Sequence, residues 1–106
     1  MNEQIEPIFI GQVDDIDIDS VENFEHEGID YAIYRFSHGF FATQGFCPCD
    51  QNSIMSEGNL ENEEIECPSC NKIYSIVSGD CVSNPELDRL KIFDVTIEKD
   101  NLYLNI

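Results

Sequence analysis

The chain has 106 residues, enough for one small domain but not for a substrate pocket with its own catalytic groups. We therefore expect an electron carrier or accessory component and not an enzyme. Its 22 Asp and Glu outnumber its five Lys and Arg, which gives a formal net charge of -17. A surface this negative repels nucleic-acid phosphates and anionic lipid headgroups, so we expect no nucleic-acid binding and no membrane association. The charge serves either solubility alone or docking onto a basic partner, and composition leaves both open.

The beginning of the chain is not expected to act as a targeting signal. Residues 1–6 are acidic where a signal peptide would be basic, and no apolar run follows them. No stretch reaches transmembrane length, so the expected location is the cytoplasm. In a reducing compartment, cysteines that are grouped in pairs indicate metal ligands before they indicate disulfides.

Strand patterns dominate both ends of the sequence. No segment keeps an apolar period of 3.6 residues, so we expect little helix. Residues 15–19 alternate isoleucine with aspartate, which predicts an edge strand with solvated aspartates. The predicted strands are residues 7–13, 15–19, 29–36, 40–43, 90–98 and 102–106, with turns at 37–39 and 99–101.

A region of different character lies between these strands, from residue 45 to residue 79. It holds four of the five cysteines, together with short strand candidates around Ile65 and residues 74–77. We interpret it as a metal-binding subdomain inserted into an antiparallel β-sandwich or barrel. The predicted organisation is one domain over residues 1–106, with a base made of 1–44 and 80–106 and a metal-binding part made of 45–79.

Two close cysteine pairs are the strongest functional signal. Cys47 and Cys49 are separated by one residue, and Cys67 and Cys70 by two. Two tight loops can present all four thiolates to one centre, and both Zn²⁺ and iron–sulfur clusters accept four sulfur ligands. Disulfides are a poorer explanation, because five cysteines leave one unpaired and partners so close in sequence have unfavourable geometry. These four cysteines are therefore predicted to be metal ligands.

The number of residues between the two cysteines of each pair distinguishes the possible types of metal site. Zinc ribbons and rubredoxins place two or more residues inside each pair, whereas the first pair here contains one. One residue in the first pair and two in the second match the Rieske pattern, Cys-x-His followed by Cys-x-x-His. Further segments resemble those of Rieske-type ferredoxins: residues 41–47 before the first loop, 58–60 and 65–68 before the second, 74–79, Pro85, and the strand at 90–95.

This resemblance implies an all-β, Rieske-like fold carrying a [2Fe-2S] cluster. Cys49 and Cys70 stand where the family has its two ligand histidines. By position, Cys47 and Cys67 would hold the inner iron, and Cys49 and Cys70 the outer iron. Neither His26 nor His38 falls at a ligand position, and both are expected to be solvated.

The implied function is that of a small ferredoxin. It would pass single electrons from a flavoprotein reductase to an oxygenase or similar acceptor. The alternative is a zinc-binding structural or interaction module on the same fold, because four thiolates also bind Zn²⁺ well. Cys81 has three open interpretations: a fifth ligand, a redox-active thiol or a small buried residue.

Thiolate ligands predict a low reduction potential. Two thiolates in place of two neutral imidazoles make the site two units more negative, which disfavours adding an electron. All-cysteine plant-type clusters lie near about -400 mV, and Rieske centres at about -150 mV and above. Pro48 and Pro68 carry no backbone N–H, so we expect them to remove one means of raising the potential.

Overall fold

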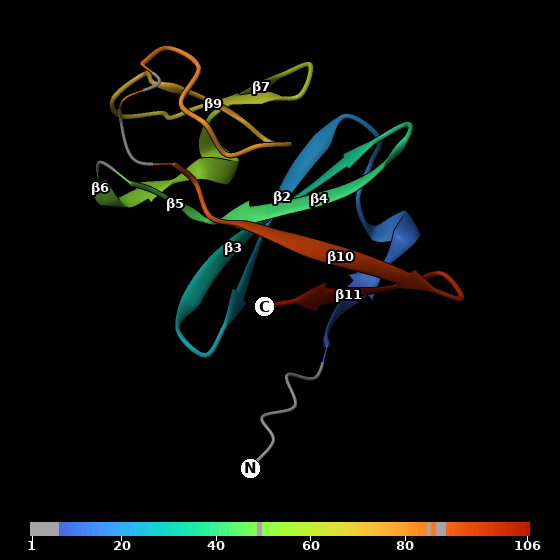
Figure 1. Ribbon diagram of the computed structural model, residues 1–106. Coiled ribbons are helices and arrows are strands. Elements are labelled where there is room, and N and C mark those ends of the chain that lie inside the picture. Colours follow the sequence, from blue (N-terminus) through green and yellow to red (C-terminus); the bar gives the residue numbers. More distant parts are fainter. Residues whose placement is uncertain (1–6, 49, 85, 87–88) are drawn as a thin grey trace.

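Six antiparallel strands form the largest sheet of the computed structural model, in the order β1-β11-β10-β4-β3-β2 (Figure 1). The structure describes residues 7–48, 50–84, 86 and 89–106. The strands of this sheet are β1 (Ile8–Gln12), β2 (Ser20–His26), β3 (Ile29–Phe36), β4 (Gly39–Gln44), β10 (Ile92–Glu98) and β11 (Asn101–Asn105). The predicted all-β architecture is therefore confirmed.

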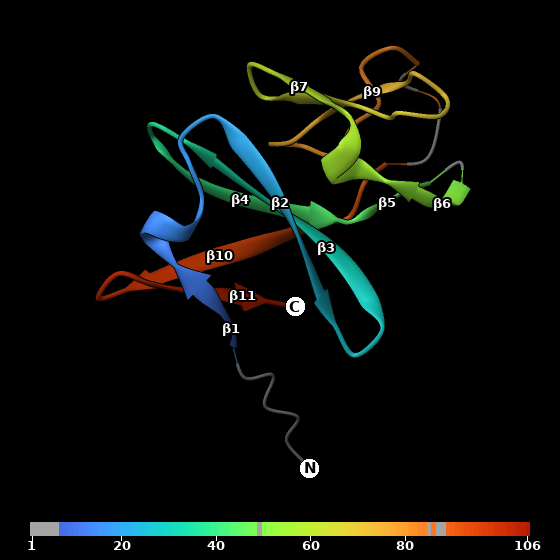
Figure 2. The ribbon, with the colours of Figure 1, turned by 180° about the vertical axis from the view of Figure 1, so that it is seen from behind.

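Two small sheets lie together on one side of the large sheet (Figures 1 and 2). The first pairs β5 (Phe46–Cys47) with β6 (Asp50–Ile54), and the second contains β7 (Asn59–Glu61), β8 (Glu64–Glu66) and β9 (Ile73–Ser75). The helical segments of the described chain are two short 3-10 turns, η1 (Val13–Asp15) and η2 (Met55–Glu57). No helix among the described residues is long and apolar enough to cross a membrane.

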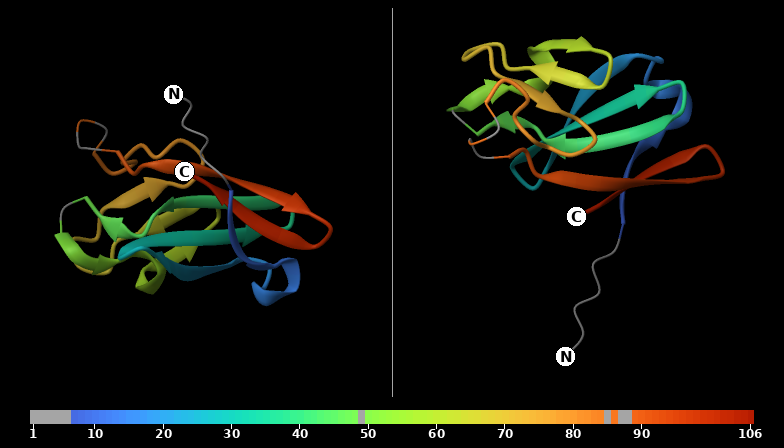
Figure 3. Two further views of the ribbon diagram at one scale, coloured as in Figure 1. Left: turned by 90° about the horizontal axis from the view of Figure 1, so that it is seen from below. Right: turned by 45° about the horizontal axis from the view of Figure 1, so that its top comes forward.

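Strand β10 joins the two halves of the large sheet. Its first residues, Ile92 and Phe93, pair with β4, and residues 94–98 pair with β11. Figure 3 shows the hairpin of β10 and β11 (red) leaving β4 (green) and reaching β1 (blue). The sheet thereby curves into the nearly closed form expected of a sandwich or barrel.

Both faces of β3 are buried, which explains its nearly continuous apolar sequence. Ala32, Tyr34 and Phe36 face a core that lies beneath the small sheets. Tyr31 and Ile33 face a second core inside the large sheet. The first core also contains Cys47, Met55, Ile65, Cys67, Tyr74, Ile76, Cys81 and Leu90. The cysteine-bearing segments are thus packed directly on the central strand.

The predicted edge strand at residues 15–19 is wrong. Asp15 belongs to η1, and Asp19 adopts a positive φ of 66° in the turn that follows. The guanidinium of Arg35 donates to the carbonyl oxygens of Val13 at 3.0 Å and Ile16 at 2.8 Å. These bonds from a side chain of β3 hold the backbone of residues 13–16 in the turn and not in a strand. The edges of the large sheet are β1 and β2, and the sequence did not predict β2.

Gly58 marks a close approach between η2 and the strand that leads to Cys67. A Cβ at this position would overlap the carbonyl oxygen of Glu66. We predict that Gly58→Ala lowers the free energy of unfolding by about 3 kcal/mol, because backbone must move to admit the methyl group. Gly28→Ala is the control: Gly28 has a positive φ but open space around it, so the cost should be about 1 kcal/mol. Urea unfolding measures both, and equal losses would contradict the close approach.

Candidate metal centre

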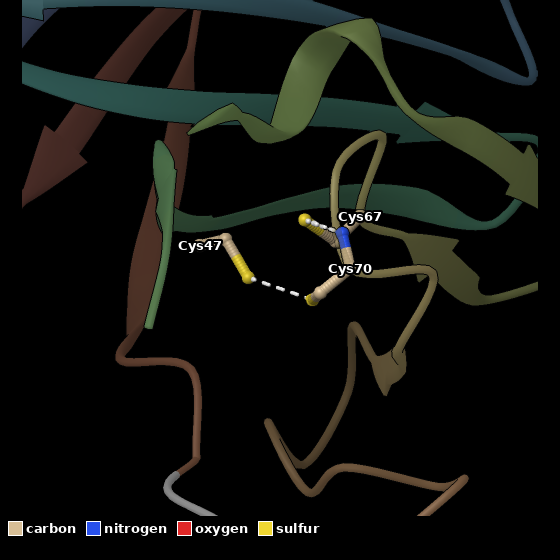
Figure 4. A group of neighbouring side chains, drawn as sticks. All are labelled: Cys47, Cys67 and Cys70. Atoms are coloured by element: carbon tan, nitrogen blue, oxygen red, sulfur yellow. Dashed lines mark hydrogen bonds between the residues drawn. The ribbon is translucent and has the colours of Figure 1, made fainter. Parts of the chain in front are cut away.

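Three of the four predicted ligands come together between the two small sheets (Figure 4). The sulfur atoms of Cys47, Cys67 and Cys70 all lie within 4.8 Å of one another, and Cys47 Sγ is 3.6 Å from Cys70 Sγ. Within the described part of the chain, no other three Cys, His, Asp or Glu side chains bring ligand atoms this close. Cys49 lies outside the described residues, so its role stays a prediction.

The second loop places two thiols on the same side because it closes tightly on itself. The Cys67 N–H donates to the carbonyl of Lys72 at 2.9 Å, and the Asn71 N–H donates to the carbonyl of Cys67 at 3.1 Å. Asn71 has a φ of 62°, a left-handed conformation that asparagine tolerates better than most residues. The resulting turn brings the side chain of Cys70 back beside that of Cys67.

Backbone amides of this loop also solvate a sulfur atom. The N–H groups of Ser69 and Cys70 donate to Cys67 Sγ at 3.4 and 3.5 Å. We expected the prolines to deny the sulfurs such donors, and for Cys67 that prediction is wrong. Pro68 has no N–H of its own, but the turn directs the N–H groups of the next two residues at the sulfur. These bonds stabilise negative charge on Cys67.

The first loop is fastened to the large sheet by the side chain of Gln44. Its amide nitrogen donates to the carbonyl of Phe46 at 2.7 Å, and its amide oxygen accepts from the N–H of Lys91 at 2.9 Å. The Gly45 N–H donates to the carbonyl of Asp30 at 2.8 Å. Cys47 therefore follows a backbone held both to β3 and to the residue that precedes β10. The sequence indicated no such role for Gln44, because its partner Lys91 is remote in the chain.

Tyr74 supplies a hydroxyl beside the sulfur group. Burial raises the pKa of Tyr74 well above its ordinary value, and the neighbouring thiols of Cys47 and Cys81 act in the same direction. A side-chain hydrogen bond between Tyr74 and Cys47 raises this pKa further. The hydroxyl thus keeps its proton through the alkaline range and can donate it to a thiolate. The sequence placed Tyr74 in an aromatic strand without assigning this contact.

The remaining candidates lie apart from the sulfur group. His38 Nε2 is 2.7 Å from a carboxylate oxygen of Glu63, and His26 stacks on Phe24. Both histidines therefore have protein partners, although each remains partly exposed. Cys81 is buried, with its sulfur 3.5 Å from the hydroxyl of Ser83, and it is outside the group of three thiols.

The donor set suits a thiophilic metal centre. Three thiols from two loops converge, and two of them, Cys47 and Cys67, are fully buried. Thiolates are ligands of both structural Zn²⁺ and iron–sulfur clusters, and each of these centres takes four protein ligands. The residues present therefore fit either group, with Cys49 as the predicted fourth ligand.

Comparisons with known proteins point to one family. The family model described as "Rieske [2Fe-2S] domain" matches residues 6–94. Ferredoxin CarAc of Metapseudomonas resinovorans is 32% identical over 73 residues, which cover 69% of this chain and 67% of that protein. The ferredoxin subunit of 3-phenylpropionate/cinnamic acid dioxygenase from Photorhabdus laumondii is 31% identical over 78 residues, 73% of each chain. Both relatives are named as ferredoxins, and the second is the ferredoxin subunit of a dioxygenase, in agreement with the expected carrier or accessory role.

Solved structures agree with this assignment. A chain from the complex of reduced oxygenase and oxidized ferredoxin in carbazole 1,9a-dioxygenase has a TM-score of 0.87 and 25% identity. That match covers 97% of this chain and 94% of the other. Sphingomonas yanoikuyae B1 ferredoxin has a TM-score of 0.85 at 20% identity, covering 95% of this chain and 99% of that one, and supports the fold alone.

Proposed function

This chain belongs to the Rieske [2Fe-2S] domain family, and on that basis we propose that it is a small electron-transfer ferredoxin. Its proposed cluster ligands are Cys47, Cys49, Cys67 and Cys70. The observation that carries the proposal is the convergence of the three described thiols within 4.8 Å on loops that the family model spans. When bound, a [2Fe-2S] cluster supplies reversible one-electron transfer.

The ligand set that we propose departs from the family pattern, since Cys49 and Cys70 replace two histidines. Support comes from Cys70, whose sulfur lies 3.6 Å from that of Cys47. Neither histidine lies in this group of ligand atoms: His38 contacts Glu63, and His26 stacks on Phe24. With only thiolates as ligands, the site binds no proton that is exchangeable in the neutral range.

We further propose that residues 45–79 form the metal-binding part and that 1–44 and 80–106 form the base. Both small sheets belong to the first range, and the large sheet belongs to the second. The core beneath the small sheets ties the two parts together through Ala32, Tyr34 and Phe36 of β3.

The proposed partners are a flavoprotein reductase as donor and an oxygenase or similar acceptor. The dioxygenase named for one relative, and the solved complex of an oxygenase with a ferredoxin, support the choice of acceptor. The docking tip would be the loop around Cys70, which is only partly buried, whereas Cys47 and Cys67 are inaccessible. Pro68 and Ser69, in the same loop, are exposed beside it. An approaching partner would therefore come nearest to the metal centre at Cys70.

Association with such a partner is predicted to weaken as salt rises. With a net charge of -17, encounter with a basic surface is accelerated at low ionic strength and screened at high ionic strength. Stopped-flow reduction by the reductase of a similar system should slow by about tenfold or more between low salt and 0.5 M salt. Reduction by a small neutral dye is the control and should barely change. A flat profile with the reductase would mean that the charge serves solubility only.

The visible spectrum tests the proposal itself. Protein purified without added metal should be coloured by sulfur-to-iron charge transfer, and reductive titration should consume one electron per chain. A colourless protein that contains zinc would instead support the structural zinc module, for which the four thiolates are equally suited.

A further inference from the structure

A buried serine contacts the second cysteine loop. Ser53 lies on β6 and is 4% exposed, and its hydroxyl donates to the hydroxyl of Ser69 at 2.6 Å. Ser69 is exposed and stands between Cys67 and Cys70. Neither serine is a predicted ligand, and a strand position this buried would ordinarily hold an apolar side chain.

This bond connects the two loops that carry the thiols. Ser53 sits on the strand that pairs with β5, and β5 ends at Cys47. Ser69 belongs to the turn that presents Cys67 and Cys70, and its own N–H donates to Cys67 Sγ at 3.4 Å. The hydroxyl of Ser53 is therefore linked to a sulfur through one intervening residue.

We propose that Ser53 is a positioning residue for the metal centre. By holding Ser69, it keeps the Cys67–Cys70 turn against the Cys47 strand before metal binds, and it aims the Ser69 N–H at Cys67 Sγ. The inference rests on the proposed function for the identity of the ligands, but it does not depend on which metal they hold.

Two physical arguments support this role. Metal ligands must be held close to their final geometry, and partners that orient them matter nearly as much as the ligands themselves. Pro68 fixes its own φ, which narrows the conformations open to the turn. One hydrogen bond to Ser69 is then enough to select the conformation in which both thiols face Cys47.

Cobalt binding by the reduced, metal-free full chain tests the proposal. Co²⁺ alone is the probe, because its bands report thiolate coordination directly, and competition with a chelator gives the affinity. Ser53→Ala and Ser69→Ala should each weaken Co²⁺ binding by roughly tenfold. The double variant should lose less affinity than the sum of the two single variants, since both remove the same bond.

Two matched variants separate positioning from packing. Ser69→Thr keeps the hydroxyl at an exposed position and should bind Co²⁺ like the wild type. Ser37→Ala removes an exposed serine from the turn between β3 and β4 and should have no effect. In the iron-loaded protein, Ser53→Ala and Ser69→Ala should also lower the reduction potential, because the N–H donor to Cys67 is no longer held in place.

The outcomes distinguish this inference from the proposed function. Wild-type affinity in both alanine variants would overturn the inference, and so would a loss in Ser53→Ala alone while Ser69→Ala is unaffected. If Ser53→Ala does not fold, Ser69→Ala and its threonine counterpart carry the test at an exposed site. Zinc in the purified wild type, together with weakened Co²⁺ binding in the variants, would overturn the electron-transfer proposal but support the positioning role.

Discussion

Cys67→Ala is expected to abolish metal binding and to lower the melting temperature by about 10 °C or more. Cys67 is fully buried, and its sulfur accepts two backbone N–H bonds as well as lying in the thiol group. A structural metal contributes up to about 10–16 kcal/mol to folding, and each kcal/mol is worth about 4–8 °C in a domain of this size. A loss of only about 2 kcal/mol of that stabilisation would lower the melting temperature by about the predicted 10 °C.

Cys81→Ala is the matched control for this variant. Cys81 is nearly as buried as Cys67, at 1% exposed, and its substitution also removes one sulfur atom. Cys81 lies outside the group of three thiols, however. The Cys81→Ala variant should retain its full metal content. Its stability should fall only by the packing contribution of one buried sulfur atom. Calorimetry and metal analysis of both variants make the comparison. Equal melting temperatures with full metal in Cys67→Ala would contradict the ligand assignment.

The effect of Cys67→Ala should be local at first. Ile65, Tyr74 and Ile76 anchor the small sheets in the core that they share with β3. The second core, inside the large sheet, contains no cysteine among the described residues, so the large sheet should depend less on the metal. Amide hydrogen exchange should therefore accelerate in β5 to β9 before it accelerates in β3 and β4. Uniform acceleration throughout the chain would indicate that the two parts unfold as one unit.

The reduction potential is expected to be low and independent of pH. All-cysteine clusters lie near about -400 mV, and Rieske centres at about -150 mV and above, so the difference expected from the ligands is about 250 mV. The Ser69 and Cys70 amides at Cys67 Sγ, and the hydroxyl of Tyr74 beside Cys47, should raise the potential slightly within that low range. They do not restore the two units of charge that separate thiolates from imidazoles.

The pH profile distinguishes the two ligand sets. Imidazole ligands can lose a proton on oxidation, which couples reduction to proton uptake, whereas bound thiolates are already deprotonated. Because the raised pKa of Tyr74 keeps its hydroxyl protonated, this neighbour also contributes no titration between neutral and moderately alkaline pH. Protein-film voltammetry from about pH 6 to pH 10 should give a flat line.

A variant with histidine at both outer positions, Cys49→His/Cys70→His, is the positive control. It should show a higher potential and a fall toward about 59 mV per pH unit in the alkaline range, the value for one proton and one electron. A slope of that size in the wild type would show a titrating ligand and would contradict the assignment of Cys70.

Local sequence patterns predicted some of the fold and missed other parts for identifiable reasons. Residues 29–36 were predicted as a strand because they are rich in β-branched and aromatic residues, a composition that follows from the burial of both faces of β3. Residues 15–19 have the period of a strand, but Arg35 draws the carbonyl of Ile16 into a turn. Such a contact joins positions remote in sequence, so no local pattern indicates it. Strand β2 was missed because it is a largely polar edge strand.

The site shows the same division between local and distant effects. The spacing of Cys67 and Cys70 predicts their convergence, because a tight turn brings two such thiols to one side. The contacts that hold the site are long-range: Ser53 to Ser69 spans 16 residues, and Gln44 to Lys91 spans 47. Serine and glutamine are common polar residues with no distinguishing pattern, so only the folded structure reveals these pairings.

Metal and sulfide analysis of the purified wild-type chain tests the central claim most directly. We predict two irons and two acid-labile sulfides per chain, as the [2Fe-2S] composition requires, with both lost in Cys67→Ala and retained in Cys81→Ala. One zinc ion per chain without labile sulfide would contradict the claim, because the same thiols would then hold a structural metal that carries no electron.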